Sequence, residues 1–194
     1  MSRKTVERGL RDATSARAEG RTIASNYFDL SQLQDYWSSA RLNHHTEATS
    51  MLYGLHEGLR ILLQEGLEDR FERHRINESA LVAGIQGMGL QIYGDMSSKL
   101  PVVTCIHIPE GIDGESVRSM LLHDFGIEIA SSFGPLTWQL CRIGTMGFSC
   151  QRKNVLHVLG ALESVLLRHR HGLPAGEAVQ AALDVYAGKE EALC

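Results

Sequence analysis

The sequence predicts an α+β fold in which a small, largely antiparallel sheet is covered on one face by helices. The first reason is the order of its periodic segments: two long helical patterns, then short strand-like runs interrupted by one helix, and a strong final helix. The second reason is composition. In a chain of 194 residues, 43% hydrophobic and 22% charged residues are typical of a globular domain with a full core.

The first forty residues have the weakest pattern. Residues 1–25 are mostly polar, so a helix there cannot bury itself well and must lean on another element. Residues 25–40 contain a possible helix that Asp29 or Ser31 could cap. Its predicted apolar side consists of Leu30, Leu33 and Trp37.

Two long helices are expected next. From Thr46, apolar residues recur at helical spacing, and this helix should run to about Gly66. A second helix follows directly and should stop at Gly87 and Gly89, since glycine commonly ends a helix. Its predicted inner face consists of Leu67, Phe71, His74, Leu81, Ile85 and Met88.

The rest of the chain alternates between short strands and helices. Residues 100–109 are β-branched and bounded by two prolines, which is typical of a strand. Further strands are predicted at residues 89–95, 127–134 and 137–147, and helices at residues 111–126, at residues 154–170 and, more weakly, after Pro174. The core-facing residues of the last strong helix should be Val155, Val158, Leu159, Leu162, Val165 and Leu166.

Charge and hydropathy exclude several classes of protein. A net charge of −4 and a pI near 6.1 give no basic surface for nucleic acid. No apolar run reaches the roughly 20 residues of a membrane span, and the N-terminus lacks the apolar core of a signal peptide. We therefore expect a cytoplasmic chain without nucleic-acid or membrane partners.

The spacing of cysteine and histidine predicts neither a metal site nor a disulfide. The four cysteines form no C-x-x-C pair. Adjacent helical side chains point about 100° apart, so His44 and His45 cannot chelate one ion as an i, i+4 pair does. The sequence also lacks a Walker loop and the G-x-S-x-G and G-x-G-x-x-G patterns.

Two residues are candidates for binding anions. Thr46 could cap a helix whose free N–H groups suit a phosphate or carboxylate, although an ordinary capped helix has the same pattern. Arg142 alternates with apolar residues in a predicted strand. Its guanidinium could hold a carboxylate by two-point contact, pair with a carboxylate of the protein, or lie on the wet face of the strand.

A family resemblance connects these candidates. The stretches NHHTEATSMLYGLHEGLRILLQEGLEDRFERH, DFGIEIASSFGPL and CRIGTMG resemble the C-terminal half of the fold-type I, class V aminotransferases, the alanine–glyoxylate and serine–pyruvate group. SNYFDL and LNHHTEAT are most similar to the ureidoglycine–glyoxylate branch, which acts in purine catabolism. The resemblance spans roughly residues 1–170 and implies the small C-terminal domain with a stub of the large one.

The resemblance assigns roles to three residues. The family consists of homodimers that depend on pyridoxal phosphate and have active sites at the subunit interface. By resemblance, Thr46 reaches the cofactor phosphate of the neighbouring subunit, and Arg142 binds the α-carboxylate of the substrate. Asn43 stands where the ureidoglycine branch has an asparagine facing the ureido group and the alanine branch has a tyrosine. Glu47 and Ala48 replace the Ile-Pro of the alanine branch.

The family's Schiff-base lysine has no counterpart here. None of Lys4, Lys99, Lys153 and Lys189 matches its motif, which in the family lies upstream of the region this sequence resembles. We therefore expect no catalytic residue in this chain, no covalently bound pyridoxal phosphate and no transamination by the chain alone.

The implied domains are residues 1–40 as a remnant of the large domain with its connecting segment, 41–172 as the small domain with its leading helix, and 173–194 as a helical tail. Three functions remain open. The first is the C-terminal portion of an aminotransferase that uses glyoxylate and, by the branch resemblance, ureidoglycine. The others are a non-catalytic oligomerisation module of the same fold and a standalone binder of small carboxylates through Arg142.

Overall fold

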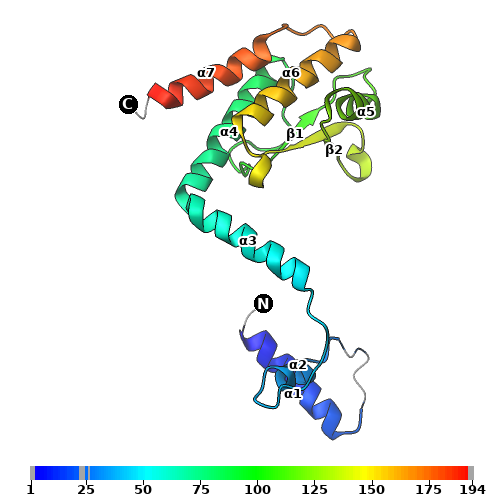
Figure 1. The fold of residues 1–194 in the computed structure, drawn as a ribbon. Coiled ribbons are helices and arrows are strands. Elements are labelled where there is room, and N and C mark those ends of the chain that lie inside the picture. Colours follow the sequence, from blue (N-terminus) through cyan, green and yellow to red (C-terminus); the bar gives the residue numbers. More distant parts are fainter. Residues whose placement is uncertain (1–2, 22–24, 26, 192–194) are drawn as a thin grey trace. The chain divides into compact units, whose positions relative to one another are not determined.

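The computed structural model describes residues 3–21, 25 and 27–191, apart from the side chains of Arg3, Val6 and residues 189–191. The chain divides into two compact units, residues 1–59 and residues 60–194, and each is described by itself (Figure 1). The domain boundaries expected at residues 40 and 172 rest on the resemblance and stay predictions.

Two short helices begin the first unit, α1 (Arg3–Ala18) and α2 (Leu30–Tyr36). Asp29 caps α2, as one of the two predicted alternatives requires: its Oδ1 accepts a hydrogen bond from the N–H of Ser31 at 3.0 Å. Its Oδ2 accepts from Nη2 of Arg17 at 2.8 Å. The polar helix α1 is therefore tied to the start of α2 by an ion pair with Asp29, whose side chain is only 3% exposed.

Helix α3 (Thr49–Glu65) begins at Thr49 rather than at Thr46, so the prediction that Thr46 is its N-cap is wrong. The carbonyl of Ala48 makes the first helical contact, since it accepts from the N–H of Met51 at 3.0 Å. The end of α3 is as predicted. Gly66 has a φ of 86°, a backbone conformation that favours glycine and ends the helix.

Helix α4 (Leu67–Gly87) leads into a three-stranded antiparallel sheet. Its strands are β1 (Val103–His107), β2 (Ala130–Ser131) and β3 (Leu140–Gly144), in the spatial order β1-β3-β2. Because β3 is central, its backbone pairs on both sides and its side chains are held in a fixed register.

The prediction of a strand at residues 89–95 is wrong. Only an isolated bridge between Ile92 and Ile106 forms there. The helix predicted between the strands is present as α5 (Gly114–Phe125), with Asp113 as N-cap and Gly126 in the left-handed conformation as C-cap. Two short 3-10 turns, Gly134–Leu136 and Gly147–Ser149, precede and follow β3.

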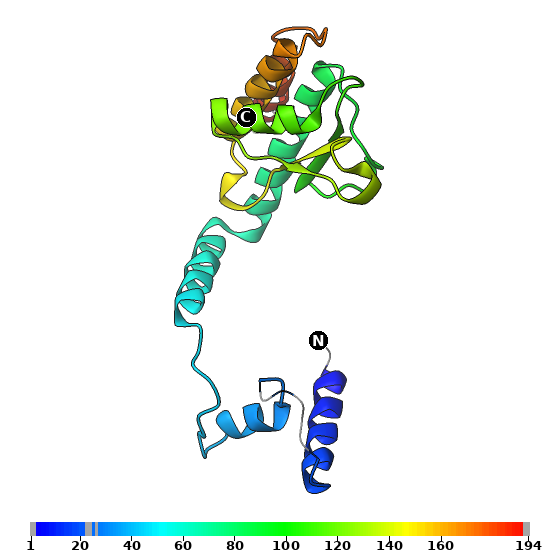
Figure 2. The same cartoon turned by 90° about the vertical axis from the view of Figure 1, so that its right-hand side faces the viewer.

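The core of the second unit lies between the sheet, α4, α6 (Arg152–Arg168) and α7 (Glu177–Glu191), which pack along one another (Figure 2). All six residues predicted for the inner face of the last strong helix are buried in α6. Cys141 and Ile143 of β3 belong to this core. The antiparallel sheet covered by helices confirms the predicted α+β class. Among the described residues, no helix is long and apolar enough to cross a bilayer.

Three apolar residues predicted to face inward are exposed instead. Trp37, the C-cap of α2, is 74% exposed, and Leu67 and Phe71 on α4 are 52% and 48% exposed. The other predicted residues of that face of α4 are buried, because α6 and α7 pack along the later part of the helix. Apolar periodicity predicts the inner face of α4, but α6 and α7 do not cover that face along its full length.

Candidate functional site

Arg142 lies in the middle of the central strand, opposite Cys105 of β1 and Ala130 of β2. Side chains alternate along a strand, so Arg142 faces away from the helical core to which Cys141 and Ile143 belong. The side chain is half-buried. The sheet therefore presents this arginine on the face that α4, α6 and α7 do not cover.

Two contacts hold the Arg142 guanidinium. Nε donates a hydrogen bond to the carbonyl of Ser131 at 2.8 Å, and the guanidinium carbon lies 4.5 Å from the centre of the Phe133 ring. Arg142 makes no ion pair with any acidic side chain in the part of the chain that the structure describes. Pairing with a carboxylate of the protein, one of the predicted alternatives, therefore does not describe Arg142. Its place on the sheet face that the helices leave uncovered agrees with the alternative of the strand's wet face, although the side chain is half-buried there.

The terminal nitrogens of Arg142 remain available. Neither Nη1 nor Nη2 hydrogen-bonds to a described residue. A planar guanidinium with two parallel N–H donors matches a carboxylate in two-point contact. The arrangement can therefore hold a small carboxylate against this face of the sheet.

The turn after β3 is held by α4. Nη1 of Arg73 donates to the carbonyl of Gly147 at 3.0 Å and to that of Cys150 at 2.6 Å. His74 lies beside it: its Nε2 accepts from the N–H of Gly147 at 3.2 Å, and its Nδ1 donates to the carbonyl of Arg70 at 2.7 Å. These contacts fix the C-terminal end of the strand that carries Arg142.

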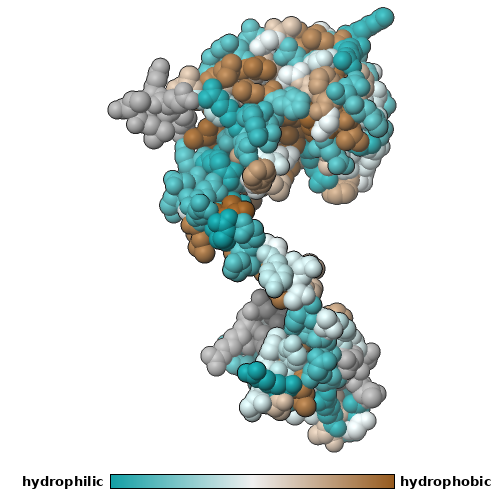
Figure 3. All heavy atoms as spheres, viewed as in Figure 1, coloured by the Kyte–Doolittle hydropathy of each residue, from teal (hydrophilic) through white to brown (hydrophobic). Residues whose placement is uncertain are grey.

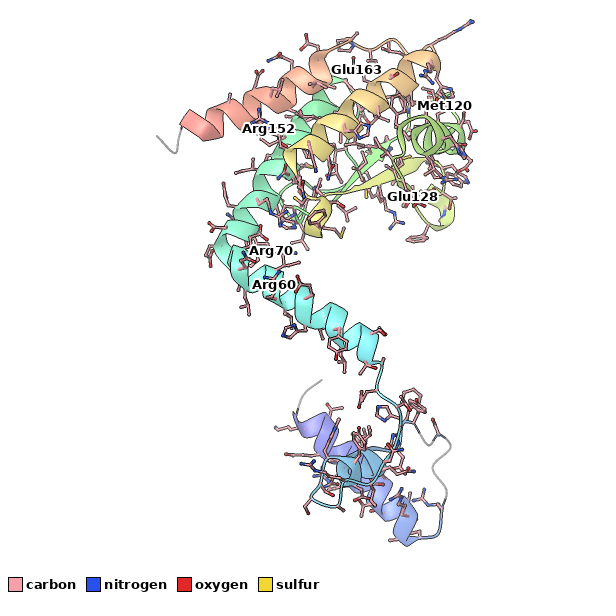
Figure 4. The ribbon with its side chains drawn as sticks, in the orientation of Figure 1. Arg60, Arg70, Met120, Glu128, Arg152 and Glu163 are labelled. Carbon is pink, nitrogen blue, oxygen red and sulfur yellow. The ribbon has the colours of Figure 1, made fainter. Side chains whose placement is uncertain are left out.

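A carboxylate at the end of α3 balances the charges of this support. Glu65 pairs with Arg73 through a short hydrogen bond and with Arg70 at 3.0 Å; Arg70 is labelled in Figure 4. The hydrogen bond from Arg73 lowers the pKa of Glu65 to about 2 and raises the pKa of Arg73. Glu65 therefore stays ionised at neutral pH, and both arginines are engaged in holding structure.

Asn43 and Thr46 belong to the other unit, in the segment without regular secondary structure that precedes α3. Both side chains are exposed and make no hydrogen bond to a described residue. The hydroxyl of Thr46 is thus free to donate to a phosphate, which fits the cofactor contact that the resemblance implies. Neither role is tested by this geometry, and both stay predictions.

The histidines between them contact each other. His44 Nδ1 and His45 Nδ1 lie 2.8 Å apart, and His45 Nε2 lies 3.2 Å from a carboxylate oxygen of Glu47. The rings of Tyr27 and Tyr36 lie 5.6 and 5.7 Å from the ring of His45. No group of three or more potential metal ligands occurs among the described residues. The two histidines instead anchor the segment that presents Asn43 and Thr46.

Comparison with known proteins connects these residues to a family. No family model matches the chain. The (S)-ureidoglycine–glyoxylate transaminase of Bacillus subtilis strain 168 is 64% identical over 196 residues, which is 99% of this chain and 47% of that protein. An alanine–glyoxylate aminotransferase of Callithrix jacchus is 37% identical over 147 residues, 74% of this chain and 36% of that protein.

Solved structures agree. The crystal structure of ureidoglycine–glyoxylate aminotransferase from Bacillus subtilis matches with a TM-score of 0.81 and 67% identity, over 91% of this chain and 46% of that one. The chain corresponds to the C-terminal part of a class V aminotransferase. It spans less than half the length of the relatives named here.

The described lysines of this aminotransferase part lie in different surroundings. Lys4 and Lys153 are exposed. Lys99 pairs closely with Glu78 and donates to the carbonyl of Leu100 at 3.3 Å, so its charge is already compensated. The side chain of Lys189 lies outside the described residues.

The cysteines differ in environment. Cys105, Cys141 and Cys150 are free thiols, and Cys194 lies outside the described residues. Burial raises the pKa of the Cys141 thiol to about 11, so it stays protonated at neutral pH. Cys105 is half-buried beside Arg142 in the sheet.

Sequence reasoning missed the residues that hold the site. Phe133 and Ser131 stand in a predicted strand and carried no signal of their contact with Arg142. Arg73 and His74 lie far from Gly147 in sequence, so only the fold brings them together. The DFGIEIASSFGPL stretch quoted for the resemblance contains both residues that touch Arg142, and it was the one available signal.

Proposed function

We propose that this chain carries the substrate and cofactor-phosphate contacts of a pyridoxal-phosphate aminotransferase that transfers an amino group to glyoxylate, with ureidoglycine as donor. The observation that carries the proposal is the half-buried Arg142, held through Nε while its terminal nitrogens stay free. The 64% identity to a ureidoglycine–glyoxylate transaminase supports the choice of branch.

Arg142 binds and orients the α-carboxylate in this proposal. Both glyoxylate and an amino acid donor carry a carboxylate next to the reacting carbon, so one arginine serves both halves of the reaction. The Ser131 carbonyl and the Phe133 ring hold the guanidinium before the substrate arrives, which reduces the ordering cost of binding.

Asn43 and Thr46 supply the remaining contacts. An exposed asparagine amide can donate and accept at once, as a ureido group requires. Thr46 donates from its hydroxyl to the cofactor phosphate across a homodimer interface. When bound, pyridoxal phosphate supplies the electron sink for amino-group transfer.

The Schiff-base lysine is proposed to come from a polypeptide segment other than residues 1–194. Lys99 is paired with Glu78, while the side chains of Lys4 and Lys153 are exposed and line no enclosed site that could hold a cofactor. The chain alone is therefore proposed to be inactive and to act only together with a segment that provides this lysine.

Complementation tests the proposal. The chain would be co-expressed with the N-terminal half of the Bacillus subtilis relative, and kcat/KM would be measured with pyridoxal phosphate, glyoxylate and either ureidoglycine or alanine. Activity that requires both polypeptides is the expected result. Arg142→Ala should lower kcat/KM for both donors by about 2 to 5 kcal/mol in transition-state stabilisation, mainly through KM.

The Asn43→Tyr variant separates the two branches of the family. Loss of the amide should penalise ureidoglycine and spare alanine, because only the ureido group leaves buried polar atoms unpaired. An equal loss for both donors would favour the broader alanine–glyoxylate assignment. Failure of every complemented pair to transaminate would overturn the proposed function itself.

A second candidate, a non-catalytic oligomerisation module, is favoured by one observation. None of the residues of α3 is buried, although the helix carries several large apolar side chains, and hydrophobic surface remains visible in Figure 3. Light scattering across a concentration series would show self-association for this module. Self-association without complemented activity would favour it over the aminotransferase.

A further inference from the structure

Phe133 contacts Arg142 without belonging to the hydrophobic core. Its side chain is 75% exposed, so it contributes little to the hydrophobic core. Yet the Arg142 guanidinium lies 4.5 Å from its ring centre, within the range of a cation–π contact. A large, mostly exposed aromatic side chain stacked on a candidate substrate-binding residue points to a role in that residue's geometry.

The loop that carries Phe133 is held in an uncommon backbone conformation. Gly134 has a φ of 58° and Trp138 a φ of 62°, which is unusual for a bulky residue. The N–H of Trp138 donates to the hydroxyl of Ser131 at 2.8 Å. Ser131 thus ties the loop with its side chain and Arg142 with its carbonyl, so both contacts of the guanidinium come from one constrained segment.

These contacts restrict how a carboxylate can approach. A guanidinium offers two paired edges to a carboxylate, one formed by Nε with one terminal nitrogen and one formed by Nη1 with Nη2. The Ser131 carbonyl occupies Nε. Phe133 occupies one side of the group. Only the Nη1 and Nη2 edge remains for two-point contact.

We propose that Phe133 is a positioning residue that, with the Ser131 carbonyl, holds Arg142 so that a carboxylate binds end-on through Nη1 and Nη2. This inference rests on the proposed function, in which Arg142 binds the substrate carboxylate. Phe133 does not need to touch the substrate. It acts by keeping the guanidinium in the orientation that binding requires.

The first test uses the 194-residue chain without a ligand. The Nε–H resonance of Arg142, assigned by its loss in Arg142→Lys, should show a ring-current shift. This shift should vanish in Phe133→Leu, persist in Phe133→Tyr and persist in Phe148→Leu. The last variant is a matched control because Phe148 is 84% exposed and makes no ring contact with Arg142. An unchanged Nε–H resonance in Phe133→Leu would show that the Phe133 ring does not stack on the Arg142 guanidinium in solution, and would overturn the inference.

The second test measures glyoxylate binding by isothermal titration calorimetry, which also reports on variants that lack the Arg142 side chain. Phe133→Leu should weaken the affinity by about 2- to 5-fold, the range expected for an exposed cation–π contact, while Phe133→Tyr restores it. Phe148→Leu should bind like the wild type. Equal affinity of Phe133→Leu and wild type, with binding lost in Arg142→Ala, would overturn this inference alone. Equal binding by Arg142→Ala and wild type would overturn the carboxylate role of Arg142 and this inference with it.

Discussion

Helices α3 and α6 have the same length, 17 residues, and opposite surroundings. In α6 the apolar residues at helical spacing are buried against α4, α5 and α7. In α3 a comparable set remains exposed, consisting of Met51, Leu52, Tyr53, Leu55, Leu59, Ile61 and Leu63. Apolar periodicity thus predicts that a helix has a face, and other elements decide whether that face is covered.

The difference predicts where stability resides. Helix stability in proteins comes mostly from packing of the apolar face rather than from intrinsic propensity. The amides of α6 should therefore exchange with solvent only by global opening, whereas those of α3 should exchange by local opening. Matched substitutions in the two helices and in the elements around them test this contrast.

Truncation of one leucine in α6 and one in α3 should give the largest difference in the free energy of unfolding. Leu159→Ala in α6 removes a fully buried side chain and should cost about 2 to 5 kcal/mol in the free energy of unfolding. Leu55→Ala in α3, at a position 58% exposed, should change it by less than about 0.5 kcal/mol. Urea denaturation of both variants checks this. Comparable losses would mean that the apolar face of α3 is covered in solution.

Replacing a glycine by alanine should lower the free energy of unfolding in α4 and raise it in α3. A Cβ at Gly84 of α4 would lie 2.7 Å from the carbonyl oxygen of Ala178, and a backbone atom cannot easily move away. Gly84→Ala should therefore destabilise by about 1 to 3 kcal/mol. At Gly58 of α3 a Cβ meets nothing within 4 Å, so Gly58→Ala should stabilise by about 0.4 to 1 kcal/mol. Thermal unfolding measures both, and a stabilising Gly84→Ala would refute the close approach.

Local signals in the sequence were sufficient wherever one residue decides the structure. The stop at Gly66 and the inner face of α6 each depend on a short stretch and were predicted, and Asp29 was one of the two predicted caps of α2. The start of α3 was not. Thr46 is a good capping residue, but the segment before α3 has no regular secondary structure, and His45 contacts both His44 and Glu47 there.

The sequence identifies Arg142 as a candidate binding residue, but it does not identify the residues that hold Arg142 in place. Arg142 was recognised from the CRIGTMG stretch and from its alternation with apolar residues. Its contacts with Ser131 and Phe133 depend on pairing between β2 and β3 and on the loop that joins them. A linear pattern specifies which side chains share a face, whereas the register of neighbouring strands is a property of the folded chain.

Removal of the cap in the first unit should have a smaller, local effect. Burial raises the pKa of Asp29, but hydrogen bonds from Ser31 and Gln32 outweigh it and lower the pKa to about 2. Asp29→Ala should destabilise α2 by about 0.5 to 2 kcal/mol. Amide exchange should accelerate in α2 and stay unchanged in α6. The exposed Asp35, at the C-terminal turn of α2, provides the control, because Asp35→Ala removes no cap.

The smallest expected effect concerns the pH dependence of the Glu65 pair with Arg73. The folded-state pKa of Glu65 is about 2, below its ordinary value of 4.5, so the pair stabilises the fold above that ordinary value and is lost as pH falls toward 2. Glu65→Gln should lower Tm at pH 7, and its gap from the wild type should narrow between about pH 4.5 and 2. The exposed Glu110, as Glu110→Gln, should show no gap at pH 7. A gap independent of pH would mean that Glu65 acts by packing rather than by its charge, and that the turn at Gly147 is held by Arg73 without help from its carboxylate partner.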